Sequence, residues 1–511
     1  MSQTIPNFDA SFCGRLPLHQ TNLIQPHGVL FVLDAASLEV LQVSENIDVL
    51  PSLDAQTVAG KPFERIADAA SFNQLQQIIG SNLTDKQMLS ITLMAGSEAI
   101  ACSASVHQKD GLLFLELLLP QYAQPAGRSF LNVYQDVKNI MTALEAQKDV
   151  HGFAETVAKE MRRLSGFDKV LVYSFDKDDH GTVLAEEKVA EMDAYLGLRF
   201  PASDIPKPAR DLYLKNPYRF IPNCNYQPAR LYPLLNPLTN AFSDLSSCDL
   251  RSVAGVHLEY LRNMQITASM SLRLVHNGRL WGLVSCHNRE AHYCSFEELG
   301  LYELLTGIFS AQLSLVLNNT VGQEQQHLQT QLTSLVPRLN AADDLYDAIS
   351  DNASDLMSLL NADGLAYSID GQQGSFGTVP DESDLDRLFY WLQVQDGDGL
   401  THLPSLTRSF EEAAHFSNVA SGILSLPVVP QQGAFVVAFR PEEIEEVSWG
   451  GNPHEALQVE GDGKTYHPRN SFKIWKQTVQ NTSRSWSEAE LNIADALKNV
   501  LAGMVIKRLH A

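Results

Sequence analysis

The chain has 511 residues, of which 44% are apolar and 19% charged, a mixture that excludes a fibrous or largely disordered protein. At about 150 residues per domain, this length predicts three or four domains. Sixty acidic residues against 37 basic ones give a net charge of −23, which argues against binding to nucleic acid or to an anionic membrane.

Residues 1–125 predict a small α+β domain on an antiparallel sheet. Three β-branched and aromatic runs indicate its strands: 28–33, 88–93 and 112–119. Turn signals such as Asp110-Gly111 separate them. A stretch with proline and glycine, residues 120–128, is typical of a linker.

Residues 126–320 predict a second α+β domain. Amphipathic patterns indicate helices at 130–146 and 150–164. Apolar runs indicate three strands, at 170–175, 270–274 and 280–286. The proline-rich middle, residues 201–237, has no regular pattern, and so long an irregular stretch inside a domain is usually functional.

The third domain, residues 321–511, ends much as the second does. Ser295 is followed by Glu298, and Ser487 by Glu490, each pair just before a helical pattern. Both fit a capping box, in which serine and glutamate satisfy the free amides of the first helical turn. We interpret the two domains as diverged copies of one module, with chance similarity as the alternative.

One helix extends beyond the second domain. Apolar residues at mostly helical spacing from Leu301 to Leu335, with Pro337 as the first proline, predict about 40 residues and a length of ~60 Å. Such a helix bridges two domains or packs against a second chain. The last helix runs almost to Ala511, so we expect it to continue in a longer protein.

The chain shows no secretory leader and no apolar run that we expect to span a membrane. Its cysteines have no disulfide-like or Cys-x-x-Cys spacing, which is typical of reduced thiols. We therefore expect a cytoplasmic protein. The cysteines are Cys13, Cys102, Cys224, Cys248, Cys286 and Cys294.

The familiar catalytic patterns are missing from the sequence. It has no phosphate-binding glycine loop, no His-Glu-x-x-His and no Gly-x-Ser-x-Gly. The histidines lack metal-ligand spacing; His287 and His292 are the nearest to a pair. These features indicate a binding or sensing protein rather than an enzyme, without a metal site.

Three segments carry more information. Cys13 precedes Ile24-Gln-Pro-His-Gly28, although a cysteine in a polar lead is usually incidental. In Pro201-Ala-Ser-Asp-Ile-Pro206, Asp204 could simply cap a helix. The third segment runs from Arg251 to His287; there arginines could clamp carboxylates, whereas the histidines could be ordinary core residues.

Together and in this order, these segments resemble the photosensory module of a bacterial phytochrome, a PAS–GAF–PHY array. The resemblance extends over essentially the whole chain. It includes His257-Leu-Glu-Tyr-Leu-Arg-Asn-Met264, and in the third domain Trp449-Gly-Gly451 and Pro468-Arg-Asn-Ser-Phe472. The last two resemble the arms of the family's tongue, an extension expected at about 440–480. The resemblance also implies that the N-terminal segment threads through the second domain as a knot.

The resemblance implies a linear tetrapyrrole, biliverdin IXα, joined by a thioether to Cys13. Plant-type and many cyanobacterial phytochromes attach a different bilin through a cysteine just before the histidine that matches His257. Here that position is Val256, which favours Cys13 and biliverdin.

Further residues are implied to bind the chromophore. Asp204 and His257 would surround the pyrrole nitrogens, Arg219 and Arg251 would hold the propionates, and His287 would bond the last ring. The remaining implied residues are Tyr173, Phe200, Ile205, Pro206, Tyr213, Tyr260, Ser269 and Ser271.

The resemblance also implies a switch. Light would turn the last ring, and Asp204 would exchange Arg469 for Ser471 as its partner. The tongue, with Trp449, would then refold between strand and helix, and the long helix would carry the change onward.

An alternative reading is a regulatory protein that senses a small metabolite or a cyclic nucleotide through a GAF-type domain; it would need neither Cys13 nor the tongue motifs. Dimerisation through the long helix is expected. So is an output domain beyond residue 511, because no kinase or cyclase motif is present.

Overall fold

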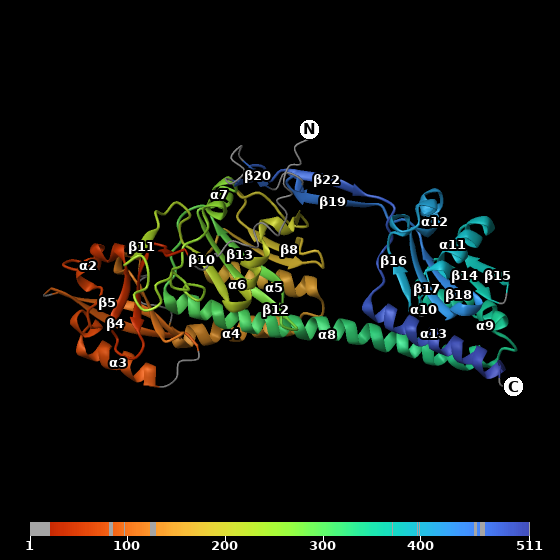
Figure 1. The fold of residues 1–511 in the computed structure, drawn as a ribbon, viewed down its shortest axis with the longest axis horizontal. Coiled ribbons are helices and arrows are strands. Elements are labelled where there is room, and N and C mark those ends of the chain that lie inside the picture. The colour runs from red at the N-terminus through yellow and green to blue at the C-terminus, as the bar shows by residue number, and fades with distance from the viewer. Residues whose placement is uncertain are drawn as a thin grey trace. The chain divides into compact units, whose positions relative to one another are not determined.

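The computed structural model (Figure 1) describes residues 21–509 except 81–84, 97, 123–128, 370, 396, 398, 454–456 and 460–465. The chain forms two compact units. The first extends to Val316 and includes Ser448–Trp475, and the second consists of Leu317–Val447 and Lys476–Ala511.

The first domain is built on an antiparallel sheet in the order β1-β11-β3-β2-β6-β5-β4. Its strands are β1 (Leu23–Ile24), β2 (Gly28–Asp34), β3 (Val40–Ser44), β4 (Gln87–Ala95), β5 (Glu98–Lys109), β6 (Leu112–Leu118) and β11 (Ala229–Tyr232), and its helices are α2 (Ala55–Val58) and α3 (Ala69–Gly80). The three predicted strands are confirmed as β2, β4 and β6. The sequence analysis missed β5, whose serines and alanines give little strand signal.

The second domain carries a sheet in the order β10-β12-β13-β7-β8-β9. Its strands are β7 (Lys169–Phe175), β8 (Gly181–Lys188), β9 (Arg199–Phe200), β10 (Tyr218–Ile221), β12 (Ala268–His276) and β13 (Arg279–Asn288), and its helices are α4 (Phe130–Glu145), α5 (Val150–Ser165), α6 (Lys207–Lys215) and α7 (Gly255–Asn263). The predicted helices and strands of this domain are confirmed. Helix α5 begins after its N-cap residue, Asp149, and ends before Gly166. Gly166 has a left-handed backbone conformation, which glycine adopts without strain.

The N-terminal segment passes between two stretches of chain that belong to the second domain in sequence, one at residues 229–230 and the other at residue 250. Leu23 and Ile24 pair with Arg230 and Ala229 of β11. On the other side, the N–H of Gln25 donates to the carbonyl of Leu250 at 2.7 Å. A segment held on both edges in this way is the arrangement expected of the knot.

The third domain forms the second unit, with a sheet in the order β15-β14-β18-β17-β16. Its strands are β14 (Gly364–Ile369), β15 (Gln372–Gly377), β16 (Thr401–Leu403), β17 (Gly422–Val429) and β18 (Ala434–Arg440), and its helices are α9 (Leu345–Asp351), α10 (Ala353–Leu359), α11 (Glu382–Val394), α12 (Ser417–Ala420) and α13 (Glu488–Leu509). Read from β16, the order matches β10-β12-β13-β7-β8 strand for strand. This shared topology is what we expect of two diverged copies of one module.

The tongue, residues 441–483, leaves the third domain after β18 and returns before α13. It contains β19 (Glu445–Gly450), β20 (Leu457–Val459), β21 (Tyr466–Pro468) and β22 (Ile474–Val479). Strands β20 and β21 pair with each other, and Trp449 of β19 pairs in parallel with Arg199 of β9.

Helix α8 (Phe296–Ala341) is the predicted long helix, and both capping boxes are confirmed. It continues past Pro337, where we expected it to stop, because Leu335 and Leu339 on either side are buried in the core of the third domain. The apolar stripe thus outweighs the hydrogen bond that proline cannot make.

Helix α8 also corrects the expectation that no run is apolar enough for a membrane. It contains an 18-residue window of mean hydropathy 1.4, long and apolar enough to cross a membrane by length and composition. This is weak evidence for a span, because 44% of the window is buried inside the protein. Side chains such as Leu305, Phe309 and Leu313 are fully buried there.

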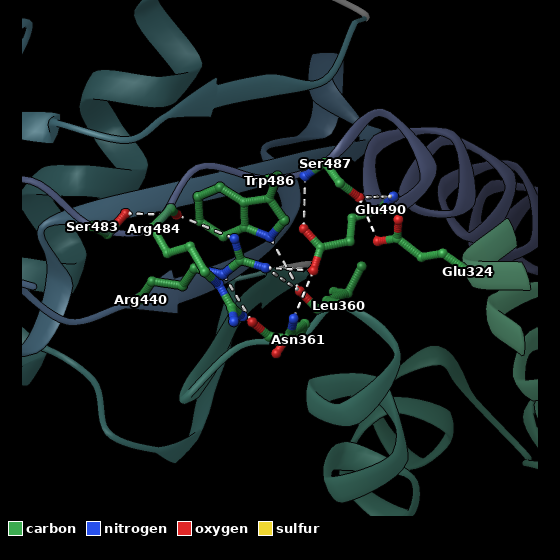
Figure 2. A network of polar contacts seen from close by, with 9 residues as sticks. All are labelled: Glu324, Leu360, Asn361, Arg440, Ser483, Arg484, Trp486, Ser487 and Glu490. Atoms are coloured by element: carbon green, nitrogen blue, oxygen red, sulfur yellow. Dashed lines mark hydrogen bonds and ion pairs between the residues drawn. The ribbon is translucent and has the colours of Figure 1, made fainter. Parts of the chain in front are cut away.

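A buried polar network lies where the tongue leaves and rejoins the third domain (Figure 2). The Arg440 guanidinium donates to Glu490 at 2.9 Å and to the carbonyl of Arg484 at 3.1 Å, and it lies 4.1 Å from the Trp486 ring. Ser487, beside Glu490, donates to Glu324 of α8 at 2.7 Å. This network therefore joins β18, α13 and α8.

Candidate functional site

A cavity of about 240 Å³ lies in the second domain. Every residue of this domain that the sequence analysis assigned to the chromophore lines it. These residues are Tyr173, Phe200, Asp204, Ile205, Pro206, Tyr213, Arg219, Arg251, His257, Tyr260, Ser269, Ser271 and His287.

Three neighbouring strands form one wall of the cavity. Ser269 and Ser271 of β12 pair with His287 and Ser285 of β13, so all four side chains share one face. The same register brings Leu171 of β7 beside Ser285. The sequence analysis missed Ser285 and Leu171, although the alternation at 269, 271 and 287 could have indicated them.

Two guanidinium groups lie in the cavity wall. Arg219 donates to the backbone carbonyls of Asp249, at 3.2 Å, and Arg251. Burial and the neighbouring Arg219 lower the pKa of Arg251 to about 9. An anion bound beside both groups would relieve their repulsion, so this wall favours carboxylates.

Helix α7 places two aromatic residues in the cavity. His257 and Tyr260 lie one turn apart and stack with their centroids 6.0 Å apart. Burial, assisted by Arg219, lowers the pKa of His257 to about 4. Burial also lowers the pKa of His287 to about 3, with smaller contributions from Lys169 and His257. Both imidazoles are therefore neutral at pH 7, and each can donate one hydrogen bond and accept another.

Asp204 forms the polar link between the cavity and the tongue. Its carboxylate accepts hydrogen bonds from Arg469 and, at 2.9 Å, from the Tyr260 hydroxyl. The side chains of Asp204 and Arg469 are 6% and 3% exposed. Burial raises the pKa of Asp204 to about 6, although Arg469 opposes the shift. Asp204 does not cap a helix, because Pro206 occupies the N-cap position of α6.

The return arm of the tongue surrounds this ion pair. The Arg469 guanidinium lies 5.5 Å from the ring of Phe200 and 5.0 Å from that of Phe472. The side-chain amide of Asn263 in α7 donates to the Arg469 carbonyl at 3.2 Å. The hydroxyl of Ser471, the expected second partner of Asp204, accepts the N–H of Lys473 instead, at 3.4 Å.

The outgoing arm docks through Trp449. Its ring lies edge-on to His180, with centroids 5.3 Å apart, and 5.2 Å from the Arg199 guanidinium. A Cβ on Gly450 would come within 2.7 Å of the Phe200 ring. Gly451 has a φ of 102°, and a Cβ there would overlap the Ser471 carbonyl. Both positions therefore require glycine, because neighbouring atoms come too close to leave room for a Cβ.

The predicted residues thus divide into three sets. Those of the second domain line one cavity, and Arg469 and Trp449 contact residues of that cavity or its neighbours. Cys13 lies outside the described residues. The sequence analysis missed Tyr195 and Pro468, which also line the cavity. Their positions depend on loop paths that local patterns do not reveal.

Comparisons with known proteins agree with this geometry. Three family models match: a PAS fold at residues 13–118, a GAF domain at 149–316 and the phytochrome region, PHY, at 328–510. Cyanobacterial phytochrome B of Nostoc sp. is 33% identical over 99% of this chain, which spans about two thirds (67%) of that relative. A bacteriophytochrome of Xanthomonas campestris is 31% identical over the whole chain and 81% of its own length.

Among solved structures, a bacteriophytochrome from the photosynthetic bacterium R. palustris superimposes with a TM-score of 0.86 at 29% identity. The match covers 98% of this chain and 99% of that one. A three-domain chain whose cavity combines a largely apolar lining with a few buried polar groups, and whose tongue docks beside it, is thus a sensory module. The chain belongs to the phytochrome family of photoreceptors, as its PAS–GAF–PHY photosensory module.

Proposed function

We propose that this chain is the light-sensing part of a red/far-red photoreceptor that binds biliverdin covalently through Cys13. Membership of the family implies a linear tetrapyrrole, and the cavity fits one in its chemistry. Within the described residues, the buried Nδ1 of His287 has no hydrogen-bond partner, which leaves it ready for a ligand. When bound, the bilin supplies light absorption and photoisomerisation.

The positions of the other cysteines support Cys13 as the attachment site. Cys102, Cys224, Cys248, Cys286 and Cys294 are all buried. Among the described residues, none of these thiols lines the cavity. Val256, which does line it, carries no thiol.

The chain's own residues would bind and orient the pigment. Arg219 and Arg251 would hold its propionates by charge-assisted hydrogen bonds. His287 would bond the carbonyl of the last ring, beside the aromatic wall of Tyr173 and Phe200. The backbone carbonyl of Asp204 would accept pyrrole N–H groups, while its carboxylate holds the tongue.

The observation that carries the proposed switch is the buried Asp204–Arg469 pair, because it links the cavity directly to the tongue. We infer that the pair holds the tongue in the dark-adapted form. After light, Asp204 would release Arg469 and bond Ser471, and the tongue would refold. Breaking a buried pair costs about 3–5 kcal/mol, enough to bias a two-state element.

Attachment is tested by incubating the purified protein with biliverdin, denaturing it and measuring bilin fluorescence on the separated band. We expect fluorescence in the parent, none in Cys13→Ala, and an unchanged signal in the control Cys102→Ala, whose thiol is buried in the core of the first domain. A fluorescent Cys13→Ala band would refute the attachment site. Absence of any pigment in the parent would refute the function.

The remaining expectations concern the whole protein. We propose that this module is not itself an enzyme, that it is cytoplasmic, and that it drives an output domain following α13. We also propose a homodimer through α8, which exposes Leu304 and Leu315 at 53% and 57%. Analytical ultracentrifugation of Leu315→Glu, expected to be monomeric, tests the dimer.

A further inference from the structure

A buried ion pair lies on the same face of the sheet as the cavity, next to the residues that line it. Lys169 begins β7 and Glu186 lies on β8, with side chains 1% and 5% exposed and 3.3 Å between Nζ and Oε1. Within the described residues, neither is part of the cavity lining. Such a pair adds little stability by itself, because loss of hydration offsets its attraction. Its contacts indicate a different role.

Both charges hold the same loop, which joins β8 to β9. The Glu186 carboxylate accepts the backbone N–H of Tyr195 at 2.9 and 3.1 Å, and that of Leu196 at 3.3 Å. The Lys169 ammonium donates to the Asp193 carbonyl at 2.6 Å. It also lies 3.4 Å from the centroid of the Tyr195 ring. The loop is thus fixed through its backbone and through one aromatic ring.

Tyr195 connects this pair to the cavity. Its ring lines the cavity and packs edge-on against Phe200, with centroids 5.8 Å apart. Lys169 also lies opposite His287 in the pairing of β7 with β13, and its charge contributes to the low pKa of that histidine. The pair therefore acts on the end of the cavity where the last ring is proposed to lie.

We propose that Lys169 and Glu186 are positioning residues that fix Tyr195 against the isomerisation site. The inference rests on the proposed photoreceptor function. It assigns these residues an effect through the 193–196 loop rather than by contact with the pigment. A Tyr195 ring held in place by this pair limits the space into which the last ring turns. Loss of the pair therefore changes the rate at which the light-formed state returns to the dark state.

The loop itself is tested without pigment, by hydrogen–deuterium exchange of the apoprotein. In Lys169→Met, the amides of Tyr195 and Leu196 should exchange at least about tenfold faster. In Lys169→Arg, which keeps the charge, and in Lys177→Met, a control at an exposed lysine, the exchange rates of these amides should stay within about threefold of the parent. Unchanged exchange in Lys169→Met would overturn the inference.

A second variant guards against misfolding. Lys169→Met leaves the Glu186 carboxylate buried without its ion-pair partner, whereas Lys169→Met with Glu186→Gln removes both charges and avoids that penalty. Faster loop exchange in the folded double variant supports the inference, and exchange equal to the parent overturns it.

The route through Tyr195 is tested on the pigmented protein by a double-mutant cycle on thermal reversion. Lys169→Met should change the reversion rate at least about fivefold in the parent, but less than about twofold in Tyr195→Ala. Equal factors in both backgrounds would overturn the inference. A parent that takes up no pigment refutes the proposed function, whereas a pigmented parent with an unchanged loop refutes this inference alone.

Discussion

Removing Arg469 should detach the tongue from the second domain. Arg469→Ala leaves the Asp204 carboxylate buried without its ion-pair partner. The hydroxyl of Tyr260 still donates a hydrogen bond to it. Loss of one partner from such a buried pair costs about 3–5 kcal/mol. Because burial already raises the pKa of Asp204 to about 6, this carboxylate can take up a proton. We therefore expect the lower end, about 3 kcal/mol, or about 100-fold in the docking equilibrium.

Hydrogen exchange of the peptide that spans residues 467–475 measures this equilibrium. Exchange should be about 100-fold faster in Arg469→Ala, and Asp204→Asn should add much less in that background than in the parent, because the two side chains interact. The control pair Glu446–Lys476, 2.8 Å apart and over 60% exposed, should show no such coupling. Additive effects of Asp204→Asn and Arg469→Ala would refute the reasoning.

Three further predictions concern separate features. Burial lowers the pKa of His287 from 6.5 to about 3, so as the pH falls below 6.5 the unfolded chain binds a proton at this histidine that the folded chain does not. His287 alone should therefore cost the apoprotein about 2 kcal/mol of stability between pH 6.5 and 4.5, and urea titrations of His287→Gln should lack this share. Gly451→Ala should accelerate tongue exchange, whereas Gly307→Ala, with no neighbour near the new methyl group, should raise helix stability by about 0.5–1 kcal/mol. Arg440→Met should destabilise the third domain by about 3 kcal/mol in thermal melts, because it leaves the buried Glu490 carboxylate without its ion-pair partner.

Each of these predictions has a contrary result. An identical pH dependence in His287→Gln would show that another group titrates. Unchanged exchange in Gly451→Ala would mean that the backbone there adapts freely. A melting temperature for Arg440→Met equal to that of the parent would show that the Figure 2 network adds no stability.

Local patterns predicted the regular elements because those patterns depend on near neighbours. Continuous runs of apolar and β-branched residues located β2 and β7, and the serine–glutamate spacing located the start of α8 and of α13. Pro337 was misleading, since its effect on the helix depends on distant packing. Strand β8 escaped notice because charged residues end it.

The site could be predicted only in part from the residues themselves. Local spacing could not decide whether Asp204 caps a helix or has a functional role, because its partner Arg469 lies far away in the sequence, in the third domain. The resemblance to phytochromes, not the pattern, linked the two. Lys169 and Glu186 gave no signal, since such residues are usually exposed and their burial depends on a loop that folds over them.

Arg440 is the last residue of β18, and its guanidinium donates a hydrogen bond to the carbonyl of Arg484, which lies just before α13. The two ends of the tongue are thus held together by the third domain itself, and the free energy of closing that loop grows only slowly with its length, by about 0.6 kcal/mol for each doubling. The intervening chain can lengthen, shorten or change its secondary structure without opening the sheet beneath it. Replacing residues 441–483 by a short turn should therefore leave the third domain folded, which makes the tongue exchangeable between relatives.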